Sequence, residues 1–169
     1  MNGVDGEAIR LRTHRPGDIG WVISQHGELY AREYGWDIRF ESFVARIAAD
    51  FVDQFDASRE VCYLAVRGEG DAEERLGCAF VVKQDATVAK LRMVLLRPEA
   101  RGLGIGKRLV RACIDFARGA GYTRMTLWTN DVLHAARAIY IAEGFTRVAE
   151  ERHHSFGLDL VGQNWERAL

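Results

Sequence analysis

The segment from Val94 to Leu109 constrains the fold of this chain more than any other. An apolar run leads into a turn that contains Gly102, Gly104 and Gly106, and an amphipathic helical pattern begins directly after it. Glycines in such a turn let backbone N–H groups converge on an anion, and the positive end of the helix dipole adds to the attraction. The sequence therefore predicts a strand, an anion-binding loop and a helix in succession, with a pyrophosphate as a fitting ligand.

Two common phosphate loops do not match this segment. A dinucleotide fingerprint requires G-x-G-x-x-G with an acidic residue about 20 positions later, and a Walker A loop ends in G-K-[ST]. Here Lys107 is followed by Arg108, which has no hydroxyl to bind magnesium. The pattern that remains is Arg101-x-x-Gly104-x-Gly106, after a strand that ends in Leu-x-Pro.

Composition narrows the range of partners. A chain of 169 residues suits one domain with one core, and a net charge of −1 gives no basic footprint for nucleic acid or an anionic membrane. Cys62, Cys78 and Cys113 are expected to be reduced core residues, and their spacing predicts no metal site. No apolar run approaches the roughly 20 residues of a membrane span, and residues 1–7 are expected to be flexible. These features favour a cytoplasmic protein.

Apolar periodicity along the chain predicts an alternation of strands and helices. Strands are expected over residues 8–12, 61–66, 76–83, 86–96, 122–128, 145–152 and 158–165, and helices over 19–30, 40–55, 109–120 and 132–143. The charged turn from Arg67 to Arg75 is expected to be a solvated loop. His153 and His154 are expected in a loop between the two closing strands.

This order of elements, with the R-x-x-G-x-G loop after the fourth strand and Tyr140-x-x-x-Gly144-Phe145 near the end, resembles the GNAT superfamily of N-acetyltransferases over about residues 8–168. The resemblance implies an α+β fold in one domain, with a mixed central sheet of about seven strands and four flanking helices. From Leu11 to His134 the chain is also similar to the acetyltransferase half of bacterial proteins that fuse a MarR-type regulator to a GNAT domain.

The resemblance implies acetyl-CoA as co-substrate, with its pyrophosphate on the loop amides and its pantetheine arm paired to the fourth strand. The residues implied to bind it are Leu95, Leu96, Arg101, Gly102, Leu103, Gly104, Ile105, Gly106 and Lys107. Leu133 stands where many members carry an asparagine that contacts CoA, so Asn130 or His134 is expected to replace that contact. Asn130 is an equal candidate for the cap of the following helix.

Acetyl transfer needs an uncharged amine, a stabilised oxyanion and a proton for the departing thiolate. Tyr140 stands where the family commonly has its general acid, and a phenol is protonated at neutral pH. Its alternative role is that of a core tyrosine. A backbone N–H of Leu95 or Leu96 is the expected oxyanion donor, and His153 or His154 is the expected base, because the pKa of histidine suits an amine proton.

The acceptor is expected between the first two helices and the closing loop, because these segments flank the cleft opposite CoA. Aromatic and acidic residues that could enclose a small cationic amine are Tyr30, Glu33, Tyr34, Trp36, Asp37 and Phe156, and Glu33, Asp37 and Asp131 also compete with the histidines as base. The competing interpretation is that Tyr34 and Trp36 cover the helix junction as core residues, and the sequence favours it for Trp36. His14 and His26 are expected to be structural.

The leading hypothesis is an acetyl-CoA-dependent N-acetyltransferase that acts on a primary amine of a small molecule, such as an amino acid or an amine-bearing metabolite. Acetylation of protein lysines or N-termini is the alternative within the same chemistry. A non-catalytic acyl-CoA sensor is the alternative from a different class. Homodimers are common among the proteins that this chain resembles, although no segment identifies an interface.

Overall fold

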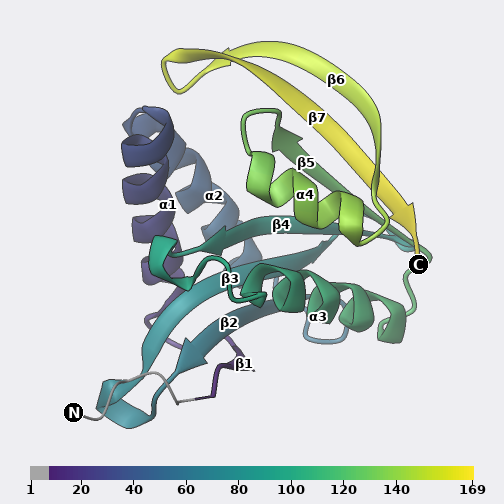
Figure 1. Ribbon diagram of the computed structural model, residues 1–169. Helices are drawn as coiled ribbons and strands as arrows, with labels where there is room; N and C mark the ends of the chain where they lie inside the picture. Colours follow the sequence, from purple (N-terminus) through teal and green to yellow (C-terminus); the bar gives the residue numbers. More distant parts are fainter. Residues whose placement is uncertain (1–7) are drawn as a thin grey trace.

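The computed structural model describes residues 8–169, and its strands join into one mixed sheet (Figure 1). Seven strands and four α-helices lie within those residues, so the predicted fold class is confirmed. Their bounds in chain order are β1 (Arg10–Thr13), α1 (Asp18–Tyr34), α2 (Ile38–Asp53), β2 (Val61–Arg67), β3 (Glu74–Lys83), β4 (Val88–Leu96), α3 (Ile105–Gly119), β5 (Arg124–Asn130), α4 (His134–Ala142), β6 (Thr146–Ser155) and β7 (Leu158–Ala168). The prediction of a flexible segment over residues 1–7 lies outside the described residues.

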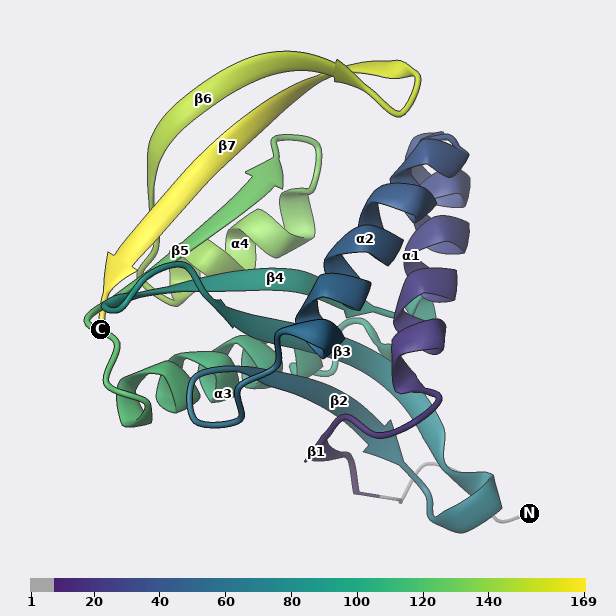
Figure 2. The same ribbon diagram turned by 180° about the vertical axis from the view of Figure 1, so that it is seen from behind.

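The sheet has the order β1-β2-β3-β4-β5-β7-β6, in which β4 and β5 are parallel and the other neighbours are antiparallel. Parallel neighbours need a crossover connection, and α3 supplies it. The pairing joins Val88–Leu91 to Arg124–Leu127 and stops there. Beyond Leu91 the two strands diverge, as the two opposite views show (Figures 1 and 2).

Helices cover both faces of this sheet. Figures 1 and 2 show α1 and α2 on one face and α3 and α4 on the other. α3 buries an apolar stripe at helical spacing, made by Leu109, Val110, Cys113, Ile114 and Ala117. On the opposite face, Val22 and Leu29 of α1 pack with Phe51 of α2 and with side chains of β2 and β3. The two layers hold β4 in the centre of the core.

The cysteines belong to that core. Cys62, Cys78 and Cys113 are buried and unpaired, as predicted. Burial raises the pKa of all three thiols, which keeps them protonated and unreactive. Between residues 8 and 169, no helix combines the length and mean hydropathy needed to cross a membrane. In the same range, no group of three or more His, Cys, Asp or Glu side chains is placed to hold a metal ion.

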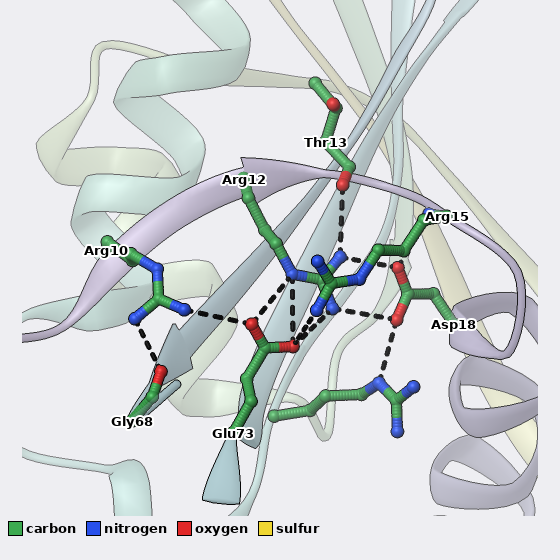
Figure 3. Close-up of polar contacts among 8 residues, drawn as sticks. Arg10, Arg12, Thr13, Arg15, Asp18, Gly68 and Glu73 are labelled. Atoms are coloured by element: carbon green, nitrogen blue, oxygen red, sulfur yellow. Dashed lines mark hydrogen bonds and ion pairs between the residues drawn. The ribbon is translucent and has the colours of Figure 1, made fainter. Parts of the chain in front are cut away.

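The charged turn between β2 and β3 is an anchor, which corrects the prediction of a solvated loop (Figure 3). Glu73 accepts hydrogen bonds from Arg10, Arg12 and Arg15 at 3.0, 2.7 and 2.7 Å. Arg12 also donates to Asp18 at the start of α1, at 2.7 Å. The turn thus ties β1 and α1 to the sheet. The prediction was wrong because the opposite charges come from a segment far away in the sequence.

The last two strands form a hairpin whose tip reaches the junction of α1 and α2 (Figures 1 and 2). His153 and His154 lie within β6, so their predicted loop position was wrong. Their pairing with β7 continues through both histidines, and the turn shrinks to Phe156 and Gly157, which both have positive φ. The Asp37 N–H donates to the Phe156 carbonyl at 3.1 Å and fixes the tip against the helices.

Candidate functional site

A cavity of about 510 Å³ opens where β4 and β5 diverge. Aromatic side chains of α1, α2 and the β6–β7 turn form one part of its wall, β4 forms another, and β5, α4 and β6 complete it. Six of the residues predicted from sequence line it: Tyr30, Trp36, Asn130, Tyr140, His153 and Phe156. Segments that are widely separated in sequence therefore meet at one site.

The aromatic wall consists of rings packed on one another. Phe156 stacks on Trp36 with the ring centroids 5.3 Å apart, and it meets Phe40 edge-on at 5.0 Å. Tyr30 lies 4.7 Å from Phe40 and 5.0 Å from Trp36, again between centroids. Trp36 is 3% exposed, so it packs as a core residue and also lines the cavity. This wall is suited to the apolar part of a ligand.

Tyr140 enters the cavity wall from α4. Burial raises the pKa of its phenol above the ordinary value, and Cys113 adds to the shift. The phenol is therefore protonated at neutral pH and able to donate a proton or a hydrogen bond. Gly144, with φ of 87°, ends the helix, and the Phe145 N–H donates to the Tyr140 carbonyl at 2.9 Å. The Tyr-x-x-x-Gly-Phe motif is thus a helix end that fixes the position of this tyrosine.

His153 is held by hydrogen bonds on both ring nitrogens. Its Nε2 lies 2.8 Å from Asn130 Oδ1, and its Nδ1 lies 2.9 Å from Ser155 Oγ. An amide oxygen only accepts, so Nε2 carries the proton and Nδ1 is left to accept from the serine hydroxyl. Asn130 is buried by this contact, and Leu133 is the N-cap of α4, so the Asn130 side chain does not cap that helix.

The backbone of Leu96 faces the gap between the diverging strands. The Arg97 N–H donates to the Leu76 carbonyl at 2.9 Å, which marks a hydrogen-bonded pair of the β3–β4 ladder. Such pairs alternate along antiparallel strands, so Leu95 bonds to its partner Cys78 in β3. Leu96, between these two pairs, directs its N–H and C=O away from β3. Of the two predicted leucines, Leu96 is therefore the one with backbone groups toward the site.

The predicted anion loop is an open turn before α3. Gly102 and Gly104 have φ of 78° and 75°, and a Cβ at either position would meet no atom within 4 Å. The left-handed backbone, rather than crowding, is what requires glycine at both positions. Gly104 is the N-cap of α3 and has no side chain to cap it, so the first N–H groups of the helix are available to an anion.

Gly106 has a different role in the same segment. A Cβ there would lie 2.8 Å from Cδ1 of Ile139, so this glycine allows α3 to approach α4 closely. Of its neighbours, Ile105 is buried, whereas Leu103 and Lys107 are exposed. The loop therefore combines two turn glycines with one packing glycine, and Lys107 is the exposed cation at its end.

Besides Leu95, Leu96 and the residues of the anion loop, the predicted site residues that do not line the cavity are Glu33, Tyr34, Asp37, Asp131, His134 and His154. Glu33 pairs with Arg101 of the anion loop at 2.8 Å, and Asp37, a further candidate base, pairs with Arg39. His154 lies 2.8 Å from Asp159 on the exposed side of the hairpin. His134 is exposed at the start of α4. Two acidic residues predicted for the acceptor site, Glu33 and Asp37, thus pair with arginines instead of lining the cavity.

Other cavity residues were missed from the sequence: Lys90, Arg92, Trp128, Glu151 and Ser155, with His26 assigned only a structural role. His26 is 2% exposed, and its Nδ1 donates to the Val22 carbonyl at 2.7 Å. Burial lowers the pKa of His26 to about 4, so its ring is neutral at neutral pH. The alternation of Lys90 and Arg92 with buried Ala89 and Leu91 was the signal that could have identified the cations.

Comparison with known proteins agrees with this geometry. The family model described as "Acetyltransferase (GNAT) family" matches residues 21–145. That range begins in α1 and ends just after α4, so it includes the anion loop, Tyr140 and most of the cavity wall.

Individual relatives and solved structures resemble this chain over different shares of their length. An uncharacterized N-acetyltransferase of Schizosaccharomyces pombe is 28% identical over 127 residues, which are 75% of this chain and 75% of that protein. Human N-acetyltransferase 8B is 34% identical over 97 residues, 55% of this chain and 42% of the human protein, so the match spans less than half of it. A Salmonella typhimurium protein solved with acetyl-CoA has a TM-score of 0.73 at 17% identity and covers 96% of this chain and 94% of its own.

Proposed function

The chain belongs to the acetyltransferase (GNAT) family, and from this premise we propose that it transfers an acetyl group from acetyl-CoA to the primary amine of a small molecule. The observation that carries the acceptor class is the cavity of about 510 Å³, which has the size of a small-molecule site. Its aromatic wall is closed by the contact of Phe156 with Trp36. A peptide-wide groove, by contrast, would favour a protein acceptor.

In this proposal the donor spans the molecule from the anion loop to the cavity. The pyrophosphate lies on the N–H groups that follow Gly104, where the helix dipole of α3 favours negative charge. Lys107, exposed in the first turn, adds positive charge. The pantetheine arm pairs with the carbonyl of Leu96, and the N–H of the same residue stabilises the oxyanion of the tetrahedral intermediate.

The proposed base is His153. Its Nδ1 accepts from Ser155 Oγ, so an ammonium proton passes to the serine oxygen or a water while the serine proton moves to Nδ1. Asn130 holds the opposite nitrogen and fixes the tautomer. The neutral amine then attacks the thioester carbonyl carbon, the C–N bond forms and the C–S bond breaks. Tyr140 donates its phenolic proton to the departing thiolate, as its raised pKa keeps it protonated.

The test is thiol release from acetyl-CoA against free amino acids, polyamines, aminoglycosides and lysine peptides. Saturable release with one small amine class supports the proposal. Preference for lysine peptides would replace it with protein acetylation, and tight acetyl-CoA binding without release from any amine would favour the sensor. The regulator-fusion relationship, the homodimer and the cytoplasmic location remain predictions of the sequence.

Two variants test the proposed roles. Tyr140→Phe is expected to lower kcat about a hundredfold and to leave the KM for acetyl-CoA within about twofold, because the hydroxyl acts in the chemical step. His153→Gln is expected to lower kcat to a similar extent. Tyr63→Phe is the matched control, since Tyr63 packs against the core outside the cavity. Unchanged turnover in either site variant would remove that residue from the mechanism.

A further inference from the structure

Two cations of β4 line the cavity on the face of the sheet that α1 and α2 cover. Arg92 pairs with Phe80 of β3, and Lys90 pairs with Val82. Cross-strand partners share a face, and Phe80 and Val82 pack in the cluster that joins α1 and α2 to the sheet. Lys90 and Arg92 therefore lie on that same face, and both contribute to the cavity wall.

Neither cation has a directly bonded anionic partner in the part of the chain that the structure describes. No hydrogen bond or ion pair within residues 8–169 involves the side chain of Lys90 or Arg92, although both are partly buried. Burial lowers the pKa of both groups; Arg92 lowers that of Lys90 further, and Asp50 opposes the shift of Arg92. Burying a cation without an anionic partner raises the free energy of the folded protein. Their position in a cavity suggests that a ligand supplies the opposite charge.

The cavity has few acids to play that part. Glu33 and Asp37, which the sequence suggested for binding an ammonium, are paired with Arg101 and Arg39. Within the described residues, Glu151 of β6 is the carboxylate that lines the cavity. The site therefore presents two cations and one carboxylate beside an aromatic wall. This excess of positive charge disfavours binding of a polycation. It favours binding of a ligand that carries both an amine and an anionic group.

We propose that the acceptor amine carries an oxyanion, such as a carboxylate, and that Lys90 and Arg92 bind it while the amine is directed toward Tyr140 and His153. This inference rests on the proposed function and names its substrate class. A guanidinium binds a carboxylate or a phosphate through two parallel hydrogen bonds, and a lysine adds a point charge. Lys90 and Arg92 are thus residues that determine acceptor specificity.

The experiment compares each acceptor with its uncharged counterpart in the thiol-release assay. The panel is amino acids with different spacing between amine and carboxylate, their methyl esters, 2-aminoethyl phosphate and spermidine. Carboxylate acceptors are expected to exceed their esters in kcat/KM by about tenfold or more, because a hydrogen-bonded charge is lost in the ester. A higher rate for 2-aminoethyl phosphate than for the carboxylates would identify phosphate as the oxyanion instead.

Variants assign the effect to the two cations. Lys90→Gln and Arg92→Gln are each expected to raise the KM for a carboxylate acceptor by about tenfold to a hundredfold. The KM for its ester and for acetyl-CoA should stay within about twofold. Lys83→Gln is the matched control, because Lys83 is an exposed cation at the end of β3 and lies outside the cavity. Thermal melts of all variants confirm that each one folds.

The outcomes separate this inference from the proposed function. Thiol release that is equal for acids and esters, or unaffected by both variants, overturns the inference and leaves the acetyltransferase proposal intact. If no amine releases thiol, the proposed function fails and a second measurement decides the inference. That measurement is calorimetric titration with an N-acetylated amino acid and with its methyl ester. Binding of the acid alone, abolished by Arg92→Gln, supports the anion site, and equal binding or no binding of both overturns it.

Discussion

Glu33 accepts two hydrogen bonds from Nη2 of Arg101, at 2.8 and 3.1 Å. The pair joins the last turn of α1 to the first residue of the predicted anion loop, which follows the central strand β4. It gives both residues a role that the sequence did not suggest. Glu33 is directed away from the acceptor cavity, and Arg101 is partly neutralised before any phosphate arrives.

Substituting Glu33 by Gln is expected to lower the KM for acetyl-CoA. The variant releases the Arg101 guanidinium and removes a negative charge near the phosphate site. The pair is partly exposed, so the expected decrease is about two- to fivefold at low salt and should vanish near 1 M salt. Initial rates against acetyl-CoA concentration at both salt levels check this. A KM that rises at low salt would mean that the pair orders the loop rather than neutralising it.

A contrast between two glycines tests how tightly β3 and β4 are packed beside the proposed oxyanion site. In Gly77→Ala the new Cβ would lie 2.6 Å from the Leu95 carbonyl oxygen, which is backbone and cannot rotate away. We expect a loss of about 2 kcal/mol or more in the free energy of unfolding, together with a lower kcat. Denaturant titration and thiol-release rates measure the two effects.

The matched control for that substitution is Gly20→Ala on α1. A Cβ at Gly20 would meet no atom within 4 Å, so alanine adds helix propensity without a clash. The expected gain in unfolding free energy is about 0.5–1 kcal/mol, with unchanged kcat. If both variants had the same stability as the parent chain, the close approach at Gly77 would not constrain the strands.

The ion network at the start of α1 predicts a specific acid sensitivity. Burial alone would raise the pKa of Asp18, but hydrogen bonds from Arg12, Arg75 and the Arg15 N–H outweigh it and lower the pKa to about 2. A carboxylate with a lowered folded pKa stabilises the fold above its unfolded value of about 3.9. That contribution, about 2 kcal/mol, is lost as the pH falls from about 4 to about 2.

Asp18→Asn tests this account. The variant removes one of the two carboxylates that pair with Arg12, while Glu73 remains, so we expect a loss of about 2 kcal/mol in unfolding free energy at pH 7. The difference from the parent chain should shrink between pH 4 and pH 2. Glu74→Gln, which breaks the more exposed pair with Arg67, should cost less than about 1 kcal/mol at any pH. A constant difference across the acid range would exclude Asp18 as the titrating group.

The sequence predicted the parts of the site that depend on local pattern. The glycine turn before α3 and the tyrosine near the end of α4 are adjacent in sequence to the elements that position them, so periodicity and turn chemistry sufficed. Phe156 was also predicted, because few residues separate the two closing strands. The strand-to-helix order that identified the fold is local information of the same kind.

The missed features depend on contacts between distant segments. Glu33 was predicted for the acceptor, but its charge is satisfied by Arg101, and nothing in either local pattern reveals that pairing. The two histidines of β6 were assigned to a loop, because polar residues in a strand exposed on one face resemble a turn. Lys90 and Arg92 were missed, since a sequence does not show which face of β4 borders the cavity.

The burial of His26 predicts a second pH dependence of stability, in a less acidic range than that of Asp18. Burial lowers the pKa of His26 from 6.5 to about 4, and the hydrogen bond to Val22 opposes the shift without overcoming it. A histidine with a lowered folded pKa binds protons more readily in the unfolded chain between these two values. The free energy of unfolding should therefore fall as the pH drops from about 6.5 to about 4, by up to about 3 kcal/mol.

His26→Gln removes this titration while keeping a polar side chain of similar size. Its unfolding free energy should fall less between pH 6.5 and pH 4 than that of the parent chain, and the remaining slope belongs to groups such as His14, whose pKa burial also lowers. Urea titrations at half-unit pH steps measure both curves. Because His26 also lines the cavity beside Tyr30, the variant should change the KM of the acceptor more than that of acetyl-CoA. Parallel stability curves for the two proteins would show that His26 is already protonated, or solvated, in the folded state.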